Sequence, residues 1–160
     1  MQLELLAQIV QGEVRHQSFR PLEFHGVSMD TRKINAGNLY IAYPGPRFDG
    51  HDYLIEAQRQ GAAAALVSTW VDCDFPQIKV ADTLHALQQY AQWHREQFHP
   101  TVIAITGSCG KTTTRSMLQS ILSVNHSVLA TEGNYNNHIG VPLMLLRLNA
   151  EHTYAVFELG

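Results

Sequence analysis

The sequence predicts an α/β protein with a small amino-terminal α/β domain followed by an incomplete domain built on a parallel sheet. Apolar stretches of strand length alternate with amphipathic stretches of helix length along the chain. A strand, a glycine-rich loop and a helix follow one another over residues 102–123, which is the pattern of a parallel βαβ unit. The composition, 45% hydrophobic and 16% charged, is typical of a folded globular protein and excludes a disordered chain.

The amino-terminal domain is expected to cover residues 1–81. Its two helices carry apolar residues at helical spacing and end at Gly12 and Gly61. Turn-forming residues 35–38 separate the first two strands, and the loop 44–50 follows the second. The elements expected here, in order, are a helix at 3–10, strands at 27–32 and 39–43, a helix at 51–60, and strands at 62–67 and 77–81.

The second domain is expected to cover residues 82–160, with the boundary near Ala81. Asp82 can cap a helix that Pro100 stops. Beyond the βαβ unit, a further helix and strand are expected to extend the same sheet. The elements expected here, in order, are the capped helix, a strand at 102–106, a helix at 111–123, a strand at 127–131, a helix at 141–148 and a strand at 154–159.

Residues 106–113, which read TGSCGKTT, predict a loop that binds the phosphates of ATP. Glycines let backbone N–H groups approach phosphate oxygens, and the start of the following helix adds a positive dipole end. Lys111 supplies a positive charge, and the Thr112 hydroxyl can bind magnesium. Ile105 stands where an ordinary Walker loop has glycine, which argues against a generic P-loop kinase or GTPase. The candidate nucleotide-binding residues are Thr106, Gly107, Ser108, Cys109, Gly110, Lys111, Thr112 and Thr113.

The shortened loop resembles the ATP loop of the Mur ligase family. Residues 133–142, GNYNNHIGVP, resemble the family's GNxNNxxGVP segment, and residues 156–160, VFELG, resemble the strand end that carries a magnesium-binding glutamate. Amino-terminal blocks resemble the family's UDP-binding first domain. These blocks are residues 28–32, 37–42, 48–52 and 61–63. The motifs follow the family order from about Leu3 to Gly160.

The resemblance implies ATP-dependent amide-bond formation with ATP and Mg²⁺ as cofactors. Members with this GNxNNxxGVP segment join D-alanyl-D-alanine to UDP-N-acetylmuramoyl-tripeptide through an acyl-phosphate, and the full-length form is implied to be a monomer. By the same resemblance Lys111 stabilises the transferring phosphate, while Thr112 and Glu158 hold magnesium. Three asparagines either shape the loop beside the nucleotide or serve as turn positions and helix caps. They are Asn134, Asn136 and Asn137.

The uridine nucleotide of the substrate is expected to bind in the first domain. The alternative for its candidate residues is a turn network in which Asp30 pairs with Arg32 and a bend forms at Asp49 and Gly50. The candidates are Ser28, Asp30, Thr31, Arg32, Asp49 and His51.

The family has three domains, so the chain is interpreted as an amino-terminal fragment without the family's carbamylated lysine and third domain. Two alternatives stay open: a family member that adds a single amino acid, and a non-catalytic module that binds a UDP-sugar and ATP. The net charge of −3 without a basic run argues against nucleic-acid binding. Without a signal peptide or an apolar stretch of membrane-spanning length, a cytoplasmic bacterial protein is expected. Two cysteines and nine scattered histidines predict neither a disulfide nor a zinc site.

Overall fold

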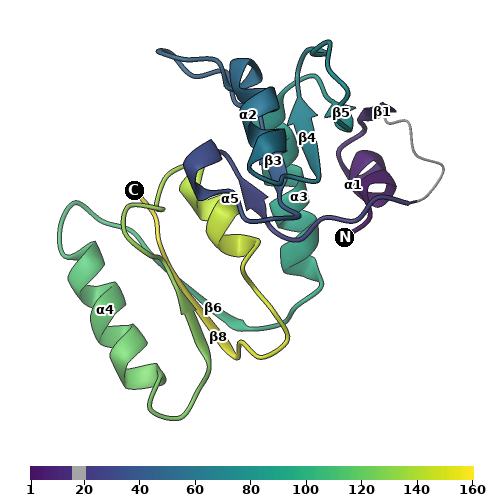
Figure 1. Cartoon of the computed structure of the whole chain (residues 1–160). Helices are drawn as coiled ribbons and strands as arrows, with labels where there is room; N and C mark the ends of the chain where they lie inside the picture. The colour runs from purple at the N-terminus through teal and green to yellow at the C-terminus, as the bar shows by residue number, and fades with distance from the viewer. Residues whose placement is uncertain (16–20) are drawn as a thin grey trace. The chain divides into compact units, whose positions relative to one another are not determined.

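The computed structural model describes residues 1–15 and 21–160 and divides into two compact units, Met1–Tyr90 and Ala91–Gly160 (Figure 1). The division falls inside helix α3 (Thr83–Glu96), whereas the boundary predicted from the sequence lies just before that helix. Each unit contains its own sheet, and strands and helices alternate along the chain. The predicted α/β class is therefore confirmed.

The first unit contains a five-stranded sheet in the order β1-β5-β4-β3-β2. All neighbouring strands are parallel except β1, which runs antiparallel to β5. The central strand β4 is buried at every position, as its alanine-rich apolar sequence predicts. Helix α2 packs on the sheet through Leu54 and Ala57. The elements of this unit are α1 (Leu3–Ile9), β1 (Glu13–Arg15), β2 (Val27–Ser28), η1 (Thr31–Lys33), β3 (Leu39–Ile41), η2 (Gly50–Tyr53), α2 (Leu54–Arg59), β4 (Ala64–Val67) and β5 (Gln77–Lys79).

One prediction for this unit was wrong, and one strand was not predicted. The strand expected at residues 27–32 ends at Ser28, because the Asp30 side chain accepts a hydrogen bond from the Arg32 backbone N–H at 3.1 Å and starts a 3₁₀ turn. Strand β1 was missed because its three residues are all exposed and show no apolar alternation. The helix expected at residues 51–60 is present, with a 3₁₀ first turn in η2.

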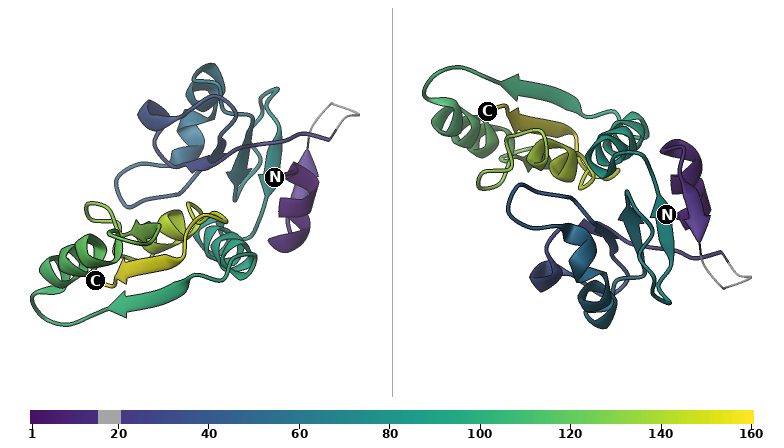
Figure 2. Two further views of the ribbon diagram at one scale, coloured as in Figure 1. Left: turned by 90° about the horizontal axis from the view of Figure 1, so that it is seen from below. Right: turned by 90° about the horizontal axis from the view of Figure 1, so that it is seen from above.

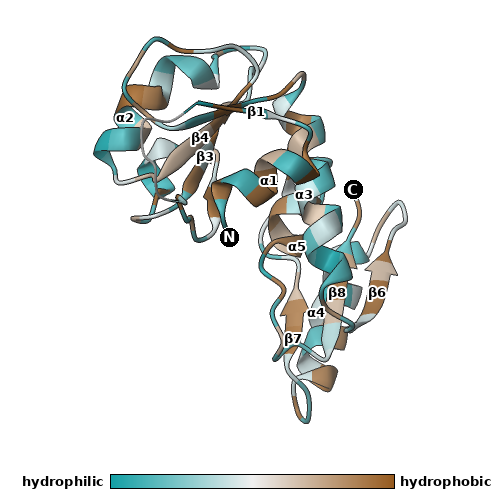
Figure 3. Ribbon diagram, turned by 90° about the vertical axis from the view of Figure 1, so that its right-hand side faces the viewer, coloured by the Kyte–Doolittle hydropathy of each residue, from teal (hydrophilic) through white to brown (hydrophobic). Residues whose placement is uncertain are grey.

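The second unit contains three parallel strands in the order β6-β8-β7. The last strand was expected to extend the sheet, but it lies between the other two; Figure 2 shows it beside β6. Its central position agrees with the complete burial of Ala155 and Val156. Figure 3 shows the apolar character of β6 and β7. The elements are β6 (Thr101–Ile105), α4 (Lys111–Leu122), β7 (Val128–Ala130), α5 (Gly140–Leu145) and β8 (Tyr154–Glu158).

Side chains alternate along β8 and connect the sheet to different helices. Ala155 and Phe157 pack in one apolar cluster with Met144 of α5. The Glu158 side chain lies on the other face of the sheet, where its carboxylate accepts a hydrogen bond from the Thr112 hydroxyl of α4. The register of β8, the most buried strand of the second unit, thus places a buried acidic residue at the start of α4.

Replacing Asp82 by alanine is expected to lower the free energy of unfolding by about 1 kcal/mol, the usual cost of losing a helix cap. The Asp82 carboxylate accepts the backbone N–H groups of Leu84 at 2.8 Å and His85 at 3.0 Å, as the sequence predicted. Urea unfolding followed by circular dichroism measures the change. Asp82→Asn, which keeps an accepting oxygen, should retain most of the stability, and an equal loss in both variants would contradict the cap.

None of the helices in residues 1–15 and 21–160 combines the length and the apolar character that crossing a bilayer requires.

Candidate functional site

The loop between β6 and α4 has the backbone form of an anion-binding turn. Gly107 has φ 143° and Gly110, at the start of α4, has φ 76°. A Cβ atom added at Gly110 would have no atom of the described residues within 4 Å. Glycine is therefore favoured there by the positive φ angle and not by crowding. No side chain of the described residues caps α4, which leaves the first N–H groups of this helix open to a ligand.

Lys111 folds back over this loop. Its Nζ donates a hydrogen bond of 2.7 Å to the Gly107 carbonyl oxygen, and the hydrogen bond is exposed. The ammonium group is therefore held beside the glycine backbone, where phosphate oxygens would be received.

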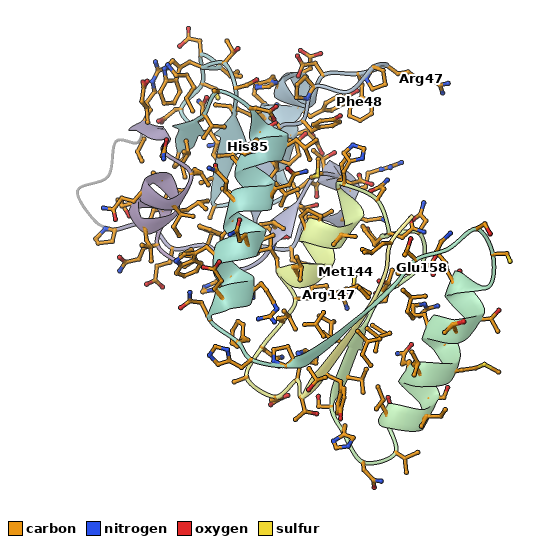
Figure 4. The ribbon with its side chains drawn as sticks, turned by 180° about the vertical axis from the view of Figure 1, so that it is seen from behind. Arg47, Phe48, His85, Met144, Arg147 and Glu158 are labelled. Atoms are coloured by element: carbon orange, nitrogen blue, oxygen red, sulfur yellow. The ribbon has the colours of Figure 1, made fainter. Side chains whose placement is uncertain are left out.

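Glu158 lies at the carboxyl end of β8 (Figure 4). Its side chain receives two side-chain hydrogen bonds. Its Oε2 accepts from the Thr112 hydroxyl at 2.9 Å, and its Oε1 accepts from Asn136 Nδ2 at 3.0 Å. The Glu158 backbone N–H donates to the Thr131 hydroxyl at 2.9 Å. The hydrogen bond from Asn136 is the main cause that lowers the pKa of Glu158, aided by Thr112 and by the charges of Arg115 and Lys111 against the effect of burial. Glu158 is therefore a carboxylate at neutral pH.

Thr112 and Glu158 form a donor set suited to magnesium. The only proton of the Thr112 hydroxyl is donated to Glu158, so the lone pairs of that oxygen remain available to a cation. In the described part of the chain no three His, Cys, Asp or Glu residues gather as a metal cluster. One hydroxyl and one carboxylate fit a hard cation that also takes phosphate oxygens as ligands, which is how Mg²⁺ is commonly bound.

Arg115 lies at this site and was missed by the sequence reasoning. Its Nε is 3.8 Å from Glu158 Oε2, and its side chain is 14% exposed. A signal was available: Arg115 follows Lys111 by four residues and Thr112 by three, and this helical spacing places all three on neighbouring positions of α4.

The three asparagines after β7 have separate positions. Asn137 caps α5, because its Oδ1 accepts the N–H groups of Ile139 at 3.1 Å and Gly140 at 2.8 Å. Asn136 holds Glu158, and Asn134 is exposed. The helix-cap alternative therefore describes Asn137, and direct contact of the three with a nucleotide stays a prediction.

A pocket of about 390 Å³ lies in the first unit. Three of the six candidates for the uridine nucleotide line it, namely Asp30, Thr31 and Arg32. Sequence reasoning missed the remaining lining residues, which are Met29, Tyr40, Phe48 and Tyr53. The Tyr40 hydroxyl donates to the Gly50 carbonyl at 3.0 Å, and burial raises the pKa of Tyr40 to about 12. The pocket thus combines an ion pair with aromatic walls.

The other three candidates build turns outside the lining of this pocket. The Ser28 hydroxyl donates to the Asp30 carbonyl at 2.9 Å. His51 Nδ1 lies 2.5 Å from Asp49 Oδ1, while its Nε2 accepts the Ser68 N–H at 2.9 Å. Since Nε2 accepts, Nδ1 carries the proton and donates it to Asp49. Both ring nitrogens of His51 are thereby engaged within the protein.

Replacing Arg32 by alanine is expected to raise the pKa of Asp30 toward its ordinary value. Arg32 donates from Nε and Nη2 to the two carboxylate oxygens at 2.8 Å each, and this hydrogen bonding is the main cause that lowers the Asp30 pKa. A lowered folded-state pKa stabilises the fold above pH 3.8, and this contribution is lost as the pH falls through the lowered value.

An NMR titration of the Asp30 carboxyl carbon below pH 5 measures this shift. Arg59→Ala, at another arginine of the same unit, should leave the Asp30 titration unchanged. An unchanged Asp30 pKa in the Arg32→Ala protein would contradict the pairing.

Comparison with known proteins gives family matches along most of the chain. The model of the Mur ligase middle domain matches residues 105–160, and the model described as Mur ligase family, catalytic domain, matches residues 23–95. The UDP-N-acetylmuramoyl-tripeptide–D-alanyl-D-alanine ligase of Escherichia coli K12 is 45% identical over 158 residues, which are 99% of this chain and 34% of that protein. The chain therefore spans about a third of the length of the curated relatives it matches.

Solved structures give the same result. MurF from Acinetobacter baumannii superposes with a TM-score of 0.89 and 41% identity over 98% of this chain and 35% of that one. The MurF ligase of Thermotoga maritima, solved in complex with ADP, has a TM-score of 0.75 and 34% identity over 84% of this chain and 31% of that one.

Proposed function

This chain belongs to the Mur ligase family, and we propose that it is the amino-terminal part of a MurF-type ligase. The proposed enzyme uses ATP to join D-alanyl-D-alanine to UDP-N-acetylmuramoyl-tripeptide and works as a monomer in the bacterial cytoplasm. The observation that carries the proposal is the meeting of Lys111, Thr112 and Glu158 at one end of the second sheet. Relatives named for that activity align over nearly the whole chain.

In the proposed reaction the loop binds the phosphates of ATP. Lys111 exchanges the Gly107 carbonyl for a phosphate oxygen, and the uncapped start of α4 directs N–H groups at the same group. Thr112 and Glu158 would hold Mg²⁺, which when bound supplies positive charge that offsets the charge of the transferring phosphate. Phosphoryl transfer is catalysed chiefly by positioning and charge neutralisation, and these residues provide both.

We propose that the pocket of the first unit receives the uridine nucleotide end of the other substrate. The exposed rings of Phe48 and Tyr53 offer faces on which a base can stack. Arg32 is held by Asp30, so its guanidinium is pre-organised at the pocket wall. Ser28, Asp49 and His51 support the loops that carry this wall.

A chimaeric ligase tests the proposed activity. The chain replaces the corresponding third of the Escherichia coli relative, and phosphate release is measured with ATP, UDP-N-acetylmuramoyl-tripeptide and D-alanyl-D-alanine. We expect release that depends on the dipeptide, with formation of the pentapeptide product.

The unmodified Escherichia coli enzyme serves as the positive control. Activity with single amino acids in place of the dipeptide would favour the alternative ligase type. A folded chimaera that binds both nucleotides and forms no product would favour a non-catalytic module.

A further inference from the structure

Arg115 carries a partly buried charge that phosphate binding by the loop does not explain. Its side chain is 14% exposed, and that of Glu158, its ion-pair partner, is 5% exposed. Removing two charges from water costs free energy that their attraction does not reliably repay, so a buried ion pair is weak evidence for stability. The position of this pair at the end of β8 points instead to a role at the site.

The guanidinium group is oriented by its own helix. Nη1 donates to Gln119 Oε1 at 3.3 Å, and Nη2 donates to the Ser116 hydroxyl at 3.2 Å. With both ends of the fork engaged, Nε is the nitrogen nearest to Glu158. This Nε is buried and finds no hydrogen-bond acceptor among the described residues. A buried donor without an acceptor is costly, and each such group in a folded protein calls for an explanation.

The Arg115 Nε is directed at the Glu158 carboxylate. Its two hydrogen bonds come from neutral groups, the Asn136 amide and the Thr112 hydroxyl. The Lys111 ammonium is bonded to Gly107, so within the described residues the charged group paired with Glu158 is Arg115. At 3.8 Å the pair is an ion pair without a hydrogen bond, and a small movement of the carboxylate toward α4 would supply the missing acceptor.

We propose that Arg115 is a positioning residue that fixes the Glu158 carboxylate for the metal–nucleotide complex. Arg115 attracts the carboxylate from the α4 side, while Asn136 and Thr112 hold its two oxygens. The orientation of Glu158 is thus set before the ligand arrives, and less of the binding free energy is lost in ordering it. Arg115 therefore increases the gain in ATP affinity that magnesium provides, without touching the phosphates. The inference rests on the proposed ATP site.

Isothermal titration calorimetry on the 160-residue chain tests this coupling. The measured quantity is the ratio of the ATP dissociation constant in EDTA to that in excess MgCl₂. We expect Arg115→Met to lower this ratio at least fivefold while changing the affinity for metal-free ATP less than twofold. Arg115→Lys keeps the charge and should restore at least half of the lost coupling. Circular dichroism establishes that each variant is folded.

Arg147→Met provides the matched control, because Arg147 pairs with Glu132 in an exposed ion pair of the same unit, and we expect an unchanged ratio. A wild-type ratio in the Arg115→Met protein, or an equal loss of affinity with and without magnesium, overturns the role proposed for Arg115. Neither outcome contradicts the proposed ATP site. A wild-type chain that binds no ATP overturns the proposed site and this inference together.

Discussion

Replacing Lys111 by alanine is expected to lower the turnover of the chimaeric ligase about 100- to 1000-fold, the usual effect of removing one charged or hydrogen-bonding group that stabilises a transition state. The Lys111 ammonium lies 2.7 Å from the Gly107 carbonyl in the loop that would hold the transferring phosphate. Its truncation leaves the developing charge on the phosphate without this cation. Affinity for the UDP-substrate should stay within about twofold, since the candidate uridine pocket belongs to the other unit.

Steady-state kinetics of phosphate release and calorimetric titration of the UDP-substrate measure the two effects. Lys79→Ala is the matched control, because Lys79 lies on β5 and pairs with Glu13 outside the candidate sites. Turnover of the Lys111→Ala enzyme equal to that of the wild type would show that the lysine does not act on the phosphate. Equal losses in turnover and in UDP-substrate affinity would indicate general damage to the fold.

Replacing Gly140 by alanine is expected to destabilise the second unit by about 3 kcal/mol, the upper end of the usual cost of overpacking. An added methyl group would lie within 2.5 Å of the Tyr135 carbonyl carbon and even closer to its Cα. Both contacts are with backbone, which cannot rotate away as a side chain can. Tyr135 precedes Asn136, so a shift of this segment would also disturb the hydrogen bond to Glu158.

Urea unfolding and ATP titration of the same protein measure both consequences. Gly45→Ala is the control, because the nearest atom to a methyl group there is the Phe48 carbonyl oxygen at 3.4 Å, an ordinary contact. We expect the control to change stability by less than about 1 kcal/mol. A Gly140→Ala protein as stable as the control would mean that the approach of α5 to Tyr135 is looser than described.

Much of the fold follows from local sequence patterns. The strand, loop and helix around Lys111 were predicted because an apolar run, two glycines and a helical stripe all occur within one short segment. The cap at Asp82 was also predicted from a local pattern, a capping residue directly before a helix. The end of β2 at Ser28 was not, since it depends on the side chain of Asp30 competing with the strand for a backbone N–H. The place of β8 between β6 and β7 is a tertiary property without a local signal.

The candidate sites were also only partly predicted, because they too depend on tertiary contacts. The sequence named Thr112 and Glu158 through resemblance, and the structure brings their side chains to 2.9 Å although 46 residues separate them. Arg115 was missed because its significance depends on the residue of β8 that faces it from the sheet. Phe48 and Tyr53 were missed because isolated aromatic residues in a loop resemble core residues until a pocket forms around them.

The central position of β8 determines when the phosphate site can form during synthesis. Strands β6 and β7 do not pair with each other, and both pair with β8, which is made last of the three. Closing this sheet brings together segments far apart in the chain, an entropic cost that slows folding. On the ribosome, the loop and helix at Lys111 would therefore emerge well before a sheet exists to support them. Glu158 arrives on the strand that joins β6 to β7, so we expect nucleotide binding to appear only after β8 has paired with both.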